Sequence, residues 1–176
     1  VTGADSGIGR AVAVLFAREG ADVSVAYRVE DDDSAETKRH VVQEGQRCRL
    51  LRGDPRDFAF CRRAVERVAA ELGRLDILVN KSVSMQVKSF SALEPSDFAA
   101  TYESAVTAAF ESARAALPAL KRAAAIAGEA SIVNIASMYG QVAPDGRLYA
   151  DREDQSPFHY GPAKAALLQL TRHLAA

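Results

Sequence analysis

The chain has 176 residues, of which 48% are hydrophobic and 26% are charged, and its formal net charge at pH 7 is −1. This size and composition are typical of one globular domain that buries a sizeable core, so we expect residues 1–176 to form a single domain. The near-zero charge, without a basic block, argues against a nucleic-acid partner. No apolar run reaches the length of a membrane span.

Short apolar segments alternate with helical patterns along the whole chain. Helices are expected at residues 8–19, 34–44, 58–72, 95–125 and 158–176, and strands at 1–2, 22–27, 47–52, 75–80 and 131–137. The acidic residues 30–33 are expected to form a solvated loop. The alternation predicts an α/β fold, in which a doubly wound parallel sheet of Rossmann type lies between two layers of helices. Ligands bind such sheets at the carboxyl ends of the strands, where the pattern places Thr2, Tyr27, Asp54, Asn80 and Ser137.

Both ends of the chain indicate a fragment of a longer protein. Of the first strand only Val1 and Thr2 are present, and no closing strand follows the last helix. We therefore expect an incomplete first strand and missing C-terminal strands, with the 1–176 fragment still carrying both a dinucleotide site and the catalytic residues.

The two cysteines, Cys48 and Cys61, are not spaced as metal ligands or as a redox pair. We expect them to be small buried hydrophobic residues in a reducing compartment, which favours a cytoplasmic location. No metal site is expected.

A glycine-rich stretch joins the first strand to the first helix. It contains Gly3, Asp5, Ser6, Gly7, Ile8 and Gly9. Gly3 can turn without a Cβ, while Gly7 and Gly9 allow a ligand or another backbone to come close. The following helix offers free N–H groups and the positive end of its dipole, which suit a pyrophosphate. Alone, this stretch fits a nucleotide site and a plain tight turn about equally well.

Three downstream residues supply proton chemistry. Tyr160 and Lys164 are four residues apart on one expected helix and therefore share a face. A nearby ammonium favours the phenolate and lowers the pKa of a tyrosine, so this pair can exchange a proton with a hydroxyl or carbonyl. Ser137, expected at the end of a strand, could donate a hydrogen bond to the same oxygen; the alternative is a serine that merely caps the strand.

Together these residues resemble the short-chain dehydrogenase/reductase family. The resemblance rests on four motifs, in the family's order: Thr2-Gly3-x-x-x-Gly7-x-Gly9, Asp76-Ile77-Leu78-Val79-Asn80, Ser137, and Tyr160-x-x-x-Lys164. It implies hydride transfer between NAD(P) and a small carbonyl or alcohol substrate. Tyr160 would be the acid/base, Lys164 would lower its pKa and hold the nicotinamide ribose, and Ser137 would position the substrate carbonyl. Asp54 matches the position that holds the adenine, and Asn80 follows the fourth strand.

The end of the second strand bears on the choice of cofactor. Members of this family that prefer NAD usually carry an acidic residue there, but this chain has Tyr27 followed by Arg28. A guanidinium suits the 2′-phosphate of NADP, so we favour NADP, with NAD as the alternative. The acidic run just after Arg28 argues mildly for NAD, and Arg28 could also be an ordinary exposed residue.

Four departures from the family pattern question whether the chain turns over substrate. Lys81 and Val83 replace small or amide residues after Asn80, and Ala105 stands where an asparagine usually completes a proton relay. Pro55 removes a backbone N–H beside Asp54. The fourth departure is a longer connection between Ser137 and Tyr160, with Asp145, Tyr149, Asp151, Arg152, Glu153 and Asp154, which is either a polar lid near the substrate or a solvated surface insert.

The sequence leaves two functions open. The first is an NADP-preferring oxidoreductase, and the second is a non-catalytic relative that acts as a nucleotide-binding or interaction module. Alanine-rich faces over residues 99–125 are compatible with packing in a homo-oligomer and equally with an intramolecular core. His159, beside Tyr160, is expected at an exposed helix start.

Overall fold

The computed structural model describes residues 1–151 and 155–176. Its α-helices are α1 (Gly7–Arg18), α2 (Asp31–Gln43), α3 (Phe58–Leu72), α4 (Pro95–Tyr102), α5 (Ala108–Ala127) and α6 (Tyr160–Ala175). The strands are β1 (Val23–Tyr27), β2 (Cys48–Arg52), β3 (Ile77–Asn80) and β4 (Ser131–Asn134). Single turns of 3-10 helix are η1 (Phe90–Ala92), η3 (Met138–Gly140) and η4 (Gly146–Leu148), and η2 (Glu103–Thr107) is a π-helix between α4 and α5.

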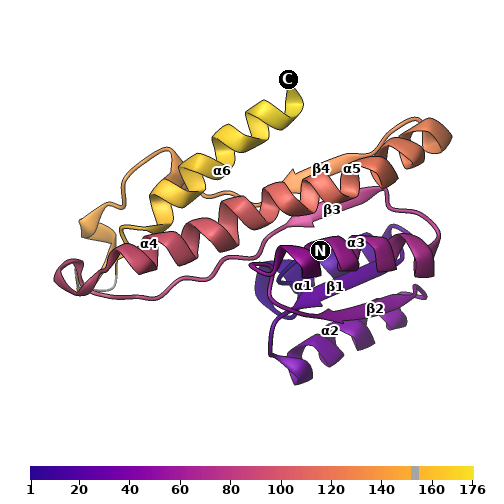
Figure 1. Cartoon of the computed structure of the whole chain (residues 1–176). Coiled ribbons are helices and arrows are strands. Elements are labelled where there is room, and N and C mark those ends of the chain that lie inside the picture. Colours follow the sequence, from indigo (N-terminus) through magenta and orange to yellow (C-terminus); the bar gives the residue numbers. More distant parts are fainter. Residues whose placement is uncertain (152–154) are drawn as a thin grey trace.

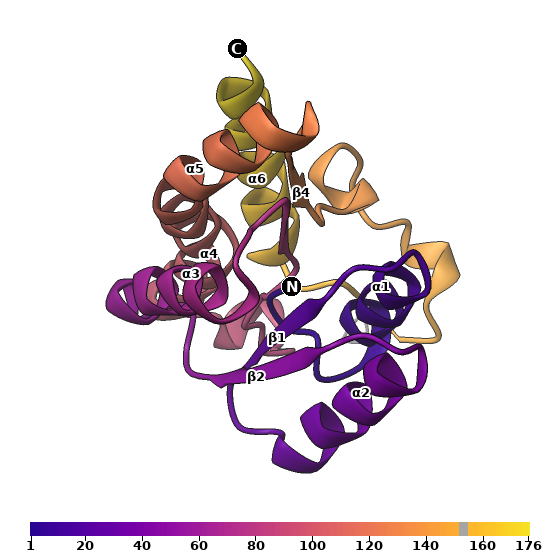
Figure 2. The ribbon, with the colours of Figure 1, turned by 90° about the vertical axis from the view of Figure 1, so that its right-hand side faces the viewer.

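Strands and helices alternate as expected, and the strand pairs are parallel. β1 pairs with β2, and β3 pairs with β4. Helices α1 and α2 lie on one face of the β1–β2 pair and α3 lies on the other (Figure 1 and Figure 2). The fold is therefore the predicted α/β arrangement, with four described strands besides the stub at the N-terminus.

That stub, Val1 and Thr2, joins the two strand pairs. Thr2 forms a parallel bridge with Ala26 of β1, and its N–H donates to the Val79 carbonyl of β3 at 2.9 Å. The carboxyl ends of β1 and β3 are thereby brought to either side of the glycine-rich turn, where a doubly wound sheet binds ligands.

Several boundaries differ from the expectation. The acidic residues Asp31, Asp32 and Asp33 are the first turn of α2, not a loop, because carboxylates are favourable at a helix N-terminus. β4 ends at Asn134, so Ser137 lies beyond the strand. The expected long helix is divided by η2, whose wider turn no propensity pattern predicts.

The core consists of small apolar clusters between the helices and strands. Cys48 and Cys61 are both buried, as expected, and neither forms a disulfide. The inner face of α5 packs within the chain, so the structure supports an intramolecular core at this face. Six of its alanines are buried: Ala108, Ala109, Ala113, Ala116, Ala119 and Ala123. None of the helices in the described ranges combines the length and apolar character that a membrane crossing requires.

Candidate active site and cofactor cleft

The glycine-rich turn is held by close backbone packing. Gly3 and Gly7 adopt φ angles of +62° and +53°, which side-chain-bearing residues rarely adopt. A Cβ on Gly9 would lie 2.2 Å from the Gly3 carbonyl oxygen, so the start of α1 packs directly on the turn. The close approach expected at Gly9 is therefore to the chain's own backbone. The space around Gly7 is open, with no atom within 4 Å of a Cβ placed there.

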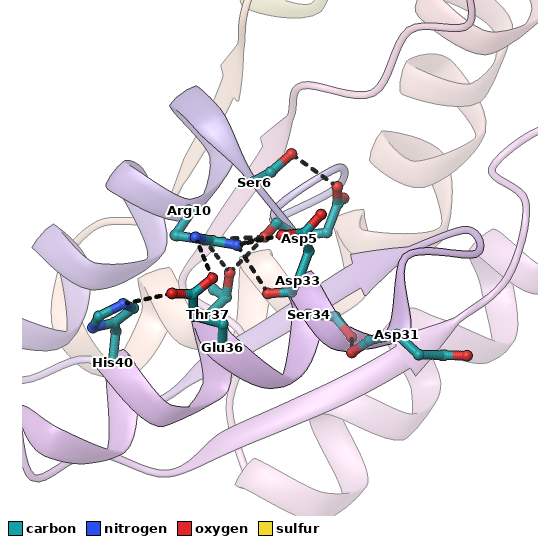
Figure 3. Close-up of polar contacts among 9 residues, drawn as sticks. All are labelled: Asp5, Ser6, Arg10, Asp31, Asp33, Ser34, Glu36, Thr37 and His40. Carbon is teal, nitrogen blue, oxygen red and sulfur yellow. Dashed lines mark hydrogen bonds and ion pairs between the residues drawn. The ribbon is translucent and has the colours of Figure 1, made fainter.

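Arg10 fixes this turn to α2 (Figure 3). Its Nε and Nη2 donate to the Asp5 carbonyl oxygen at 3.1 and 2.8 Å, and the Thr37 hydroxyl donates to the same oxygen at 2.8 Å. The guanidinium also forms ion pairs with Asp33 and Glu36. The position of the turn thus depends on one partly buried cation that both the turn and α2 contact.

The N-terminus of α1 has no side-chain cap. Ser6 is the N-cap residue, but its hydroxyl donates to the Asp5 carboxylate at 3.1 Å instead of accepting from the first turn. The first N–H groups of α1, including those of Ile8 and Gly9, are therefore available to an anion.

A cavity of about 340 Å³ opens at this turn and extends between β1 and β3. Four residues predicted or suspected to face a cofactor line it near the strand ends: Gly3, Asp5, Arg28 and Asp54. Lys81 lines the same end of the cavity. The remaining predicted residues, namely Ser6, Gly7, Ile8, Gly9, Asn80, Tyr160 and Lys164, lie outside its lining.

Asp54 is engaged by its own neighbour. Arg56 donates from Nη2 to Asp54 Oδ2 at 2.6 Å and from its backbone N–H to Oδ1 at 2.9 Å. This hydrogen bonding lowers the pKa of Asp54, with a smaller contribution from the charge of Arg28. The carboxylate therefore lines the cavity as a paired anion, and Pro55 beside it offers no N–H.

The side chain of Asn80 forms a hydrogen bond between strands and does not line this cavity. Its buried side-chain amide donates to Asn134 Oδ1 at 2.9 Å, and Asn134 in turn donates to the Thr171 hydroxyl at 2.9 Å. These bonds tie β3 to β4 and β4 to α6. They fix α6, which carries Tyr160 and Lys164, relative to the strand ends.

Lys164 is buried beside Tyr160 on α6. Its ammonium lies 5.5 Å from the centroid of the Tyr160 ring and donates to the Ile135 carbonyl at 2.6 Å. Burial lowers the pKa of Lys164 to about 8, and the positive charge of Lys81 contributes to the same shift. The predicted pairing of these two side chains on one helix face is present.

Ser137 begins the turn η3, which packs tightly on the start of α6. A Cβ on Gly140 would lie 2.9 Å from the backbone of Lys164 and Ala165, so only glycine permits this approach. The Ser137 hydroxyl oxygen accepts from the Tyr139 N–H at 3.2 Å, which leaves its own O–H free to donate elsewhere. The structure thus brings the Ser137 turn against the helix that carries Tyr160 and Lys164.

The connection between Ser137 and Tyr160 folds back on itself. The hydroxyls of Tyr139 and Tyr149 are hydrogen-bonded to each other, and Arg147 forms an ion pair with Asp145. Asp151 also has an interaction partner. Arg152, Glu153 and Asp154 lie outside the described residues.

Ala105 lies in the π-helical turn η2 and is buried. It belongs to an apolar cluster with Val106, Ala109, Ala163 and Leu167, against which Val83 packs. The position of the expected relay asparagine is therefore surrounded by apolar side chains, and two of the departures, Val83 and Ala105, occur in the same cluster.

Sequence reasoning missed the residues that hold the loop after β3. The Thr2 hydroxyl accepts from the N–H groups of Lys81 and Ser82 at 3.0 and 3.1 Å. Ser104 accepts from the Ser84 N–H at 2.8 Å, and Thr101 donates to the Ser84 carbonyl at 2.9 Å. Thr101 and Ser104 are three residues apart in an expected helix, and these two hydroxyl side chains on one face were the sequence signal for a contact with this loop.

His159 contradicts the expectation of an exposed helix start. It is 2% exposed, and its Nε2 donates to the Gln86 carbonyl at 3.1 Å while its ring meets Phe98 edge-on. A buried ring with a carbonyl partner is favourable, and it links the loop after β3 to the start of α6.

Within the described ranges, no three His, Cys, Asp or Glu side chains are grouped so that they could hold a metal ion. The polar groups of the cleft are instead backbone N–H groups, cations, hydroxyls and carboxylates such as Asp54, which is paired with Arg56.

Comparison with known proteins agrees with this arrangement. A family model described as short chain dehydrogenase matches residues 1–176. The uncharacterized oxidoreductase YhxC of Bacillus subtilis (strain 168) is 35% identical over 176 residues, which are 99% of this chain and 56% of that protein. General stress protein 39 of the same organism is 54% identical over 82 residues, which are 47% of this chain and 29% of that protein.

A solved structure is similar over almost the whole chain. It is a short chain dehydrogenase from Burkholderia cenocepacia J2315 in complex with NADP, with a TM-score of 0.86 and 32% identity, covering 99% of this chain and 65% of that one. The chain spans little more than half the length of the curated relatives that it matches from end to end. Because the family model covers every residue, the chain belongs to the short-chain dehydrogenase/reductase family, whose members are oxidoreductases that use NAD(P).

Proposed function

We propose that the protein is an NADP-preferring oxidoreductase that transfers a hydride between nicotinamide and a small carbonyl or alcohol substrate, with Tyr160 as the acid/base. The observation that carries this proposal is the buried ammonium of Lys164, 5.5 Å from the centroid of the Tyr160 ring. A cation held in a poorly solvated position stabilises negative charge that develops on a neighbouring group during proton transfer.

Each of the three site residues then has one task. Tyr160 gives a proton to the substrate carbonyl oxygen during reduction, or takes it from the alcohol during oxidation. Lys164 stays in place through its bond to the Ile135 carbonyl and supplies the positive charge. Ser137 directs its free O–H to the same substrate oxygen and so helps to orient it.

The residues of the cleft fit a dinucleotide. The uncapped first turn of α1 offers N–H groups for phosphate oxygens, and the open space beside Gly7 leaves room for them. Asp54 and Arg28 line the cavity on the side of β1 and β2, while Lys164 lies outside this lining, on α6, where it donates to the Ile135 carbonyl. When bound, the nicotinamide supplies the hydride, and the protein orients and polarises the reactants.

The surroundings of Arg28 favour NADP over NAD. The Tyr27 hydroxyl donates to Asp31 at 2.8 Å, and Asp31 also pairs with Arg52, so the acid that contacts the last residue of β1 is already engaged. Arg28 forms no ion pair with any carboxylate in residues 1–151 or 155–176. Glu30 lines the same cavity and is the group that argues for NAD.

Tyr160→Phe tests the catalytic assignment. Removing the hydroxyl should lower the turnover of a carbonyl substrate with NADPH by at least about 10²-fold, the lower bound for positioned proton transfer, while leaving NADPH affinity largely unchanged. Tyr102→Phe, on an exposed side chain of α4, is the matched control and should keep the full rate. An undiminished rate in Tyr160→Phe would contradict the proposal.

The second candidate is a non-catalytic nucleotide-binding or interaction module, and the apolar surroundings of Ala105 favour it. If the parent chain is inactive, Ala105→Asn should be made both alone and with Val83→Gly, because an amide introduced into this cluster needs the space that Val83 occupies. Activity gained in the double variant would indicate a damaged enzyme. No activity across a broad carbonyl panel, from a folded variant, would support the non-catalytic module.

A further inference from the structure

Lys81 is a cation in an unusual place. It follows the last residue of β3, and its backbone N–H is held by the Thr2 hydroxyl at 3.0 Å. Its side chain runs over the glycine-rich turn, since a Cβ placed on Gly3 would lie 3.3 Å from Lys81 Cδ. The methylenes of Lys81 are thereby positioned by the turn itself, and its backbone is fixed independently.

The charge of Lys81 has no ion-pair partner among the residues that the structure describes. No carboxylate of residues 1–151 or 155–176 forms an ion pair with it, whereas two other cations that line the same cavity, Arg56 and Arg74, are paired with Asp54 and Asp76. Besides Asp54 and Asp76, the acids that line this cavity are Asp5, Asp22 and Glu30. Asp5 accepts from Ser6, and Asp22 pairs with Arg47.

Lys81 lies between two parts of the proposed cofactor site, one at the glycine-rich turn and the other at Lys164. On one side, its stem contacts the glycine-rich turn, beside which Arg28 and Asp54 line the cavity. On the other side, its charge is close enough to Lys164 to contribute to that residue's lowered pKa. A dinucleotide that extends from Arg28 to Lys164 must pass its linking phosphates through this region.

We infer that Lys81 is a further cofactor-binding residue, whose ammonium contacts the pyrophosphate shared by NADPH and NADH. This rests on the proposed function and deepens it. A phosphate would provide a partner that residues 1–151 and 155–176 do not, and its negative charge would lessen the repulsion between Lys81 and Lys164. Because the pyrophosphate is common to both cofactors, Lys81 contributes to affinity and not to the choice between them, which is the task of Arg28.

The test is a fluorescence titration of NADPH, and separately of NADH, into the 176-residue chain and into Lys81→Met, Lys81→Arg and Arg28→Met. Methionine keeps the apolar stem over Gly3 and removes the charge. Lys121→Met, on an exposed position of α5, is the control for the same change in net charge. Inorganic pyrophosphate serves as a competitor in each case, and circular dichroism establishes that each variant is folded.

We expect Lys81→Met to weaken NADPH and NADH by the same factor, about tenfold or more, as a charge-assisted hydrogen bond of about 1.5–3 kcal/mol implies. Pyrophosphate should compete less well with this variant, and Lys81→Arg should retain most of the affinity. Arg28→Met should weaken NADPH alone. Equal NADPH affinity in Lys81→Met and Lys121→Met would overturn the role of Lys81, and a loss confined to NADPH would overturn the pyrophosphate assignment. A folded parent chain that binds neither cofactor would overturn the proposed function together with this inference.

Discussion

At the residue scale, Lys164 determines how the site responds to pH. Burial, with help from the charge of Lys81, lowers its pKa from 10.5 to about 8. Above that pH the neutral amine predominates, and the positive charge beside the Tyr160 ring is lost. Chemistry that depends on this pair therefore declines as the pH rises through about 8.

The same shift predicts a change in stability. Between pH 8 and 10.5 the unfolded chain keeps the Lys164 proton while the folded chain releases it, so the free energy of unfolding rises with pH through this group. Urea unfolding at about pH 7 and about pH 10 should show this rise in the parent chain relative to Lys164→Met. Cys48, whose pKa burial raises to about 11, titrates in both proteins and cancels from the comparison. An identical pH dependence in the two proteins would contradict a lowered Lys164 pKa.

Several residues show what the sequence could and could not predict at this scale. The pairing of Tyr160 with Lys164 follows from their spacing on a helix, and the structure confirms it. The burial of His159 could not be predicted, because the Gln86 carbonyl that receives its N–H is 73 residues away. Asp54 and Arg56 are close in the sequence, so an ion pair between them could have been predicted. Nothing in the sequence, however, indicates that the Asp54 carboxylate is already paired with Arg56 when no ligand is bound.

At the element scale, the glycine-rich turn and α2 act as one unit through Arg10. Its guanidinium contacts the Asp5 carbonyl, which precedes β1 in the chain. It also contacts three side chains of α2, which follows β1: Asp33, Glu36 and Thr37 (Figure 3). The turn is thereby preorganised for a ligand instead of being ordered by it, which lowers the entropic cost of binding.

Arg10→Met should lower the free energy of unfolding by about 1–3 kcal/mol, because the Asp5 carbonyl loses two of its three donors and Asp33 and Glu36 lose the cation that they share. NADPH affinity should fall as well, since the turn loses its link to α2. The control is Arg18→Met on the same helix, whose ion pair with Glu44 also joins α1 to α2 but is more exposed. This change should cost less than about 1 kcal/mol and leave NADPH binding intact. Equal effects of the two substitutions on both stability and binding would contradict a special role for Arg10.

The order and type of the elements could be predicted, but some of their ends could not. Helix ends marked by glycine, as at Gly20 and Gly73, lie where the sequence predicts them. The sequence favours a loop at the acidic start of α2, because a run of acidic residues is also typical of solvated turns. The attraction between these carboxylates and the helix dipole instead stabilises a helical turn there. The π-helical turn η2 has no sequence signal, since it depends on where Thr101 and Ser104 meet the loop after β3.

At the scale of the whole molecule, the cleft lies where two strand pairs meet. The β1–β2 pair carries Arg28 and Asp54 at its end, while the β3–β4 pair leads to Lys81 and, through Asn134 and Thr171, to α6. Figure 1 shows α6 and α4 on one side of this junction and α1 with α2 on the other. Arg28, Asp54 and Lys81, which are far apart in the sequence, thus line one cavity, as the topology of a doubly wound sheet predicts.

The most direct measurement is the titration of NADPH and NADH into the purified 176-residue chain, followed by fluorescence, with circular dichroism to establish that the chain is folded. We predict saturable binding of both, with NADPH bound more tightly because Arg28, which follows β1, forms no ion pair within residues 1–151 and 155–176. Bound NADPH should also stabilise the fold, by about 2.7 kcal/mol when its concentration is a hundred times its Kd. Tighter binding of NADH would contradict the cofactor preference, and the absence of binding by a folded chain would contradict the proposal that this cleft holds a dinucleotide.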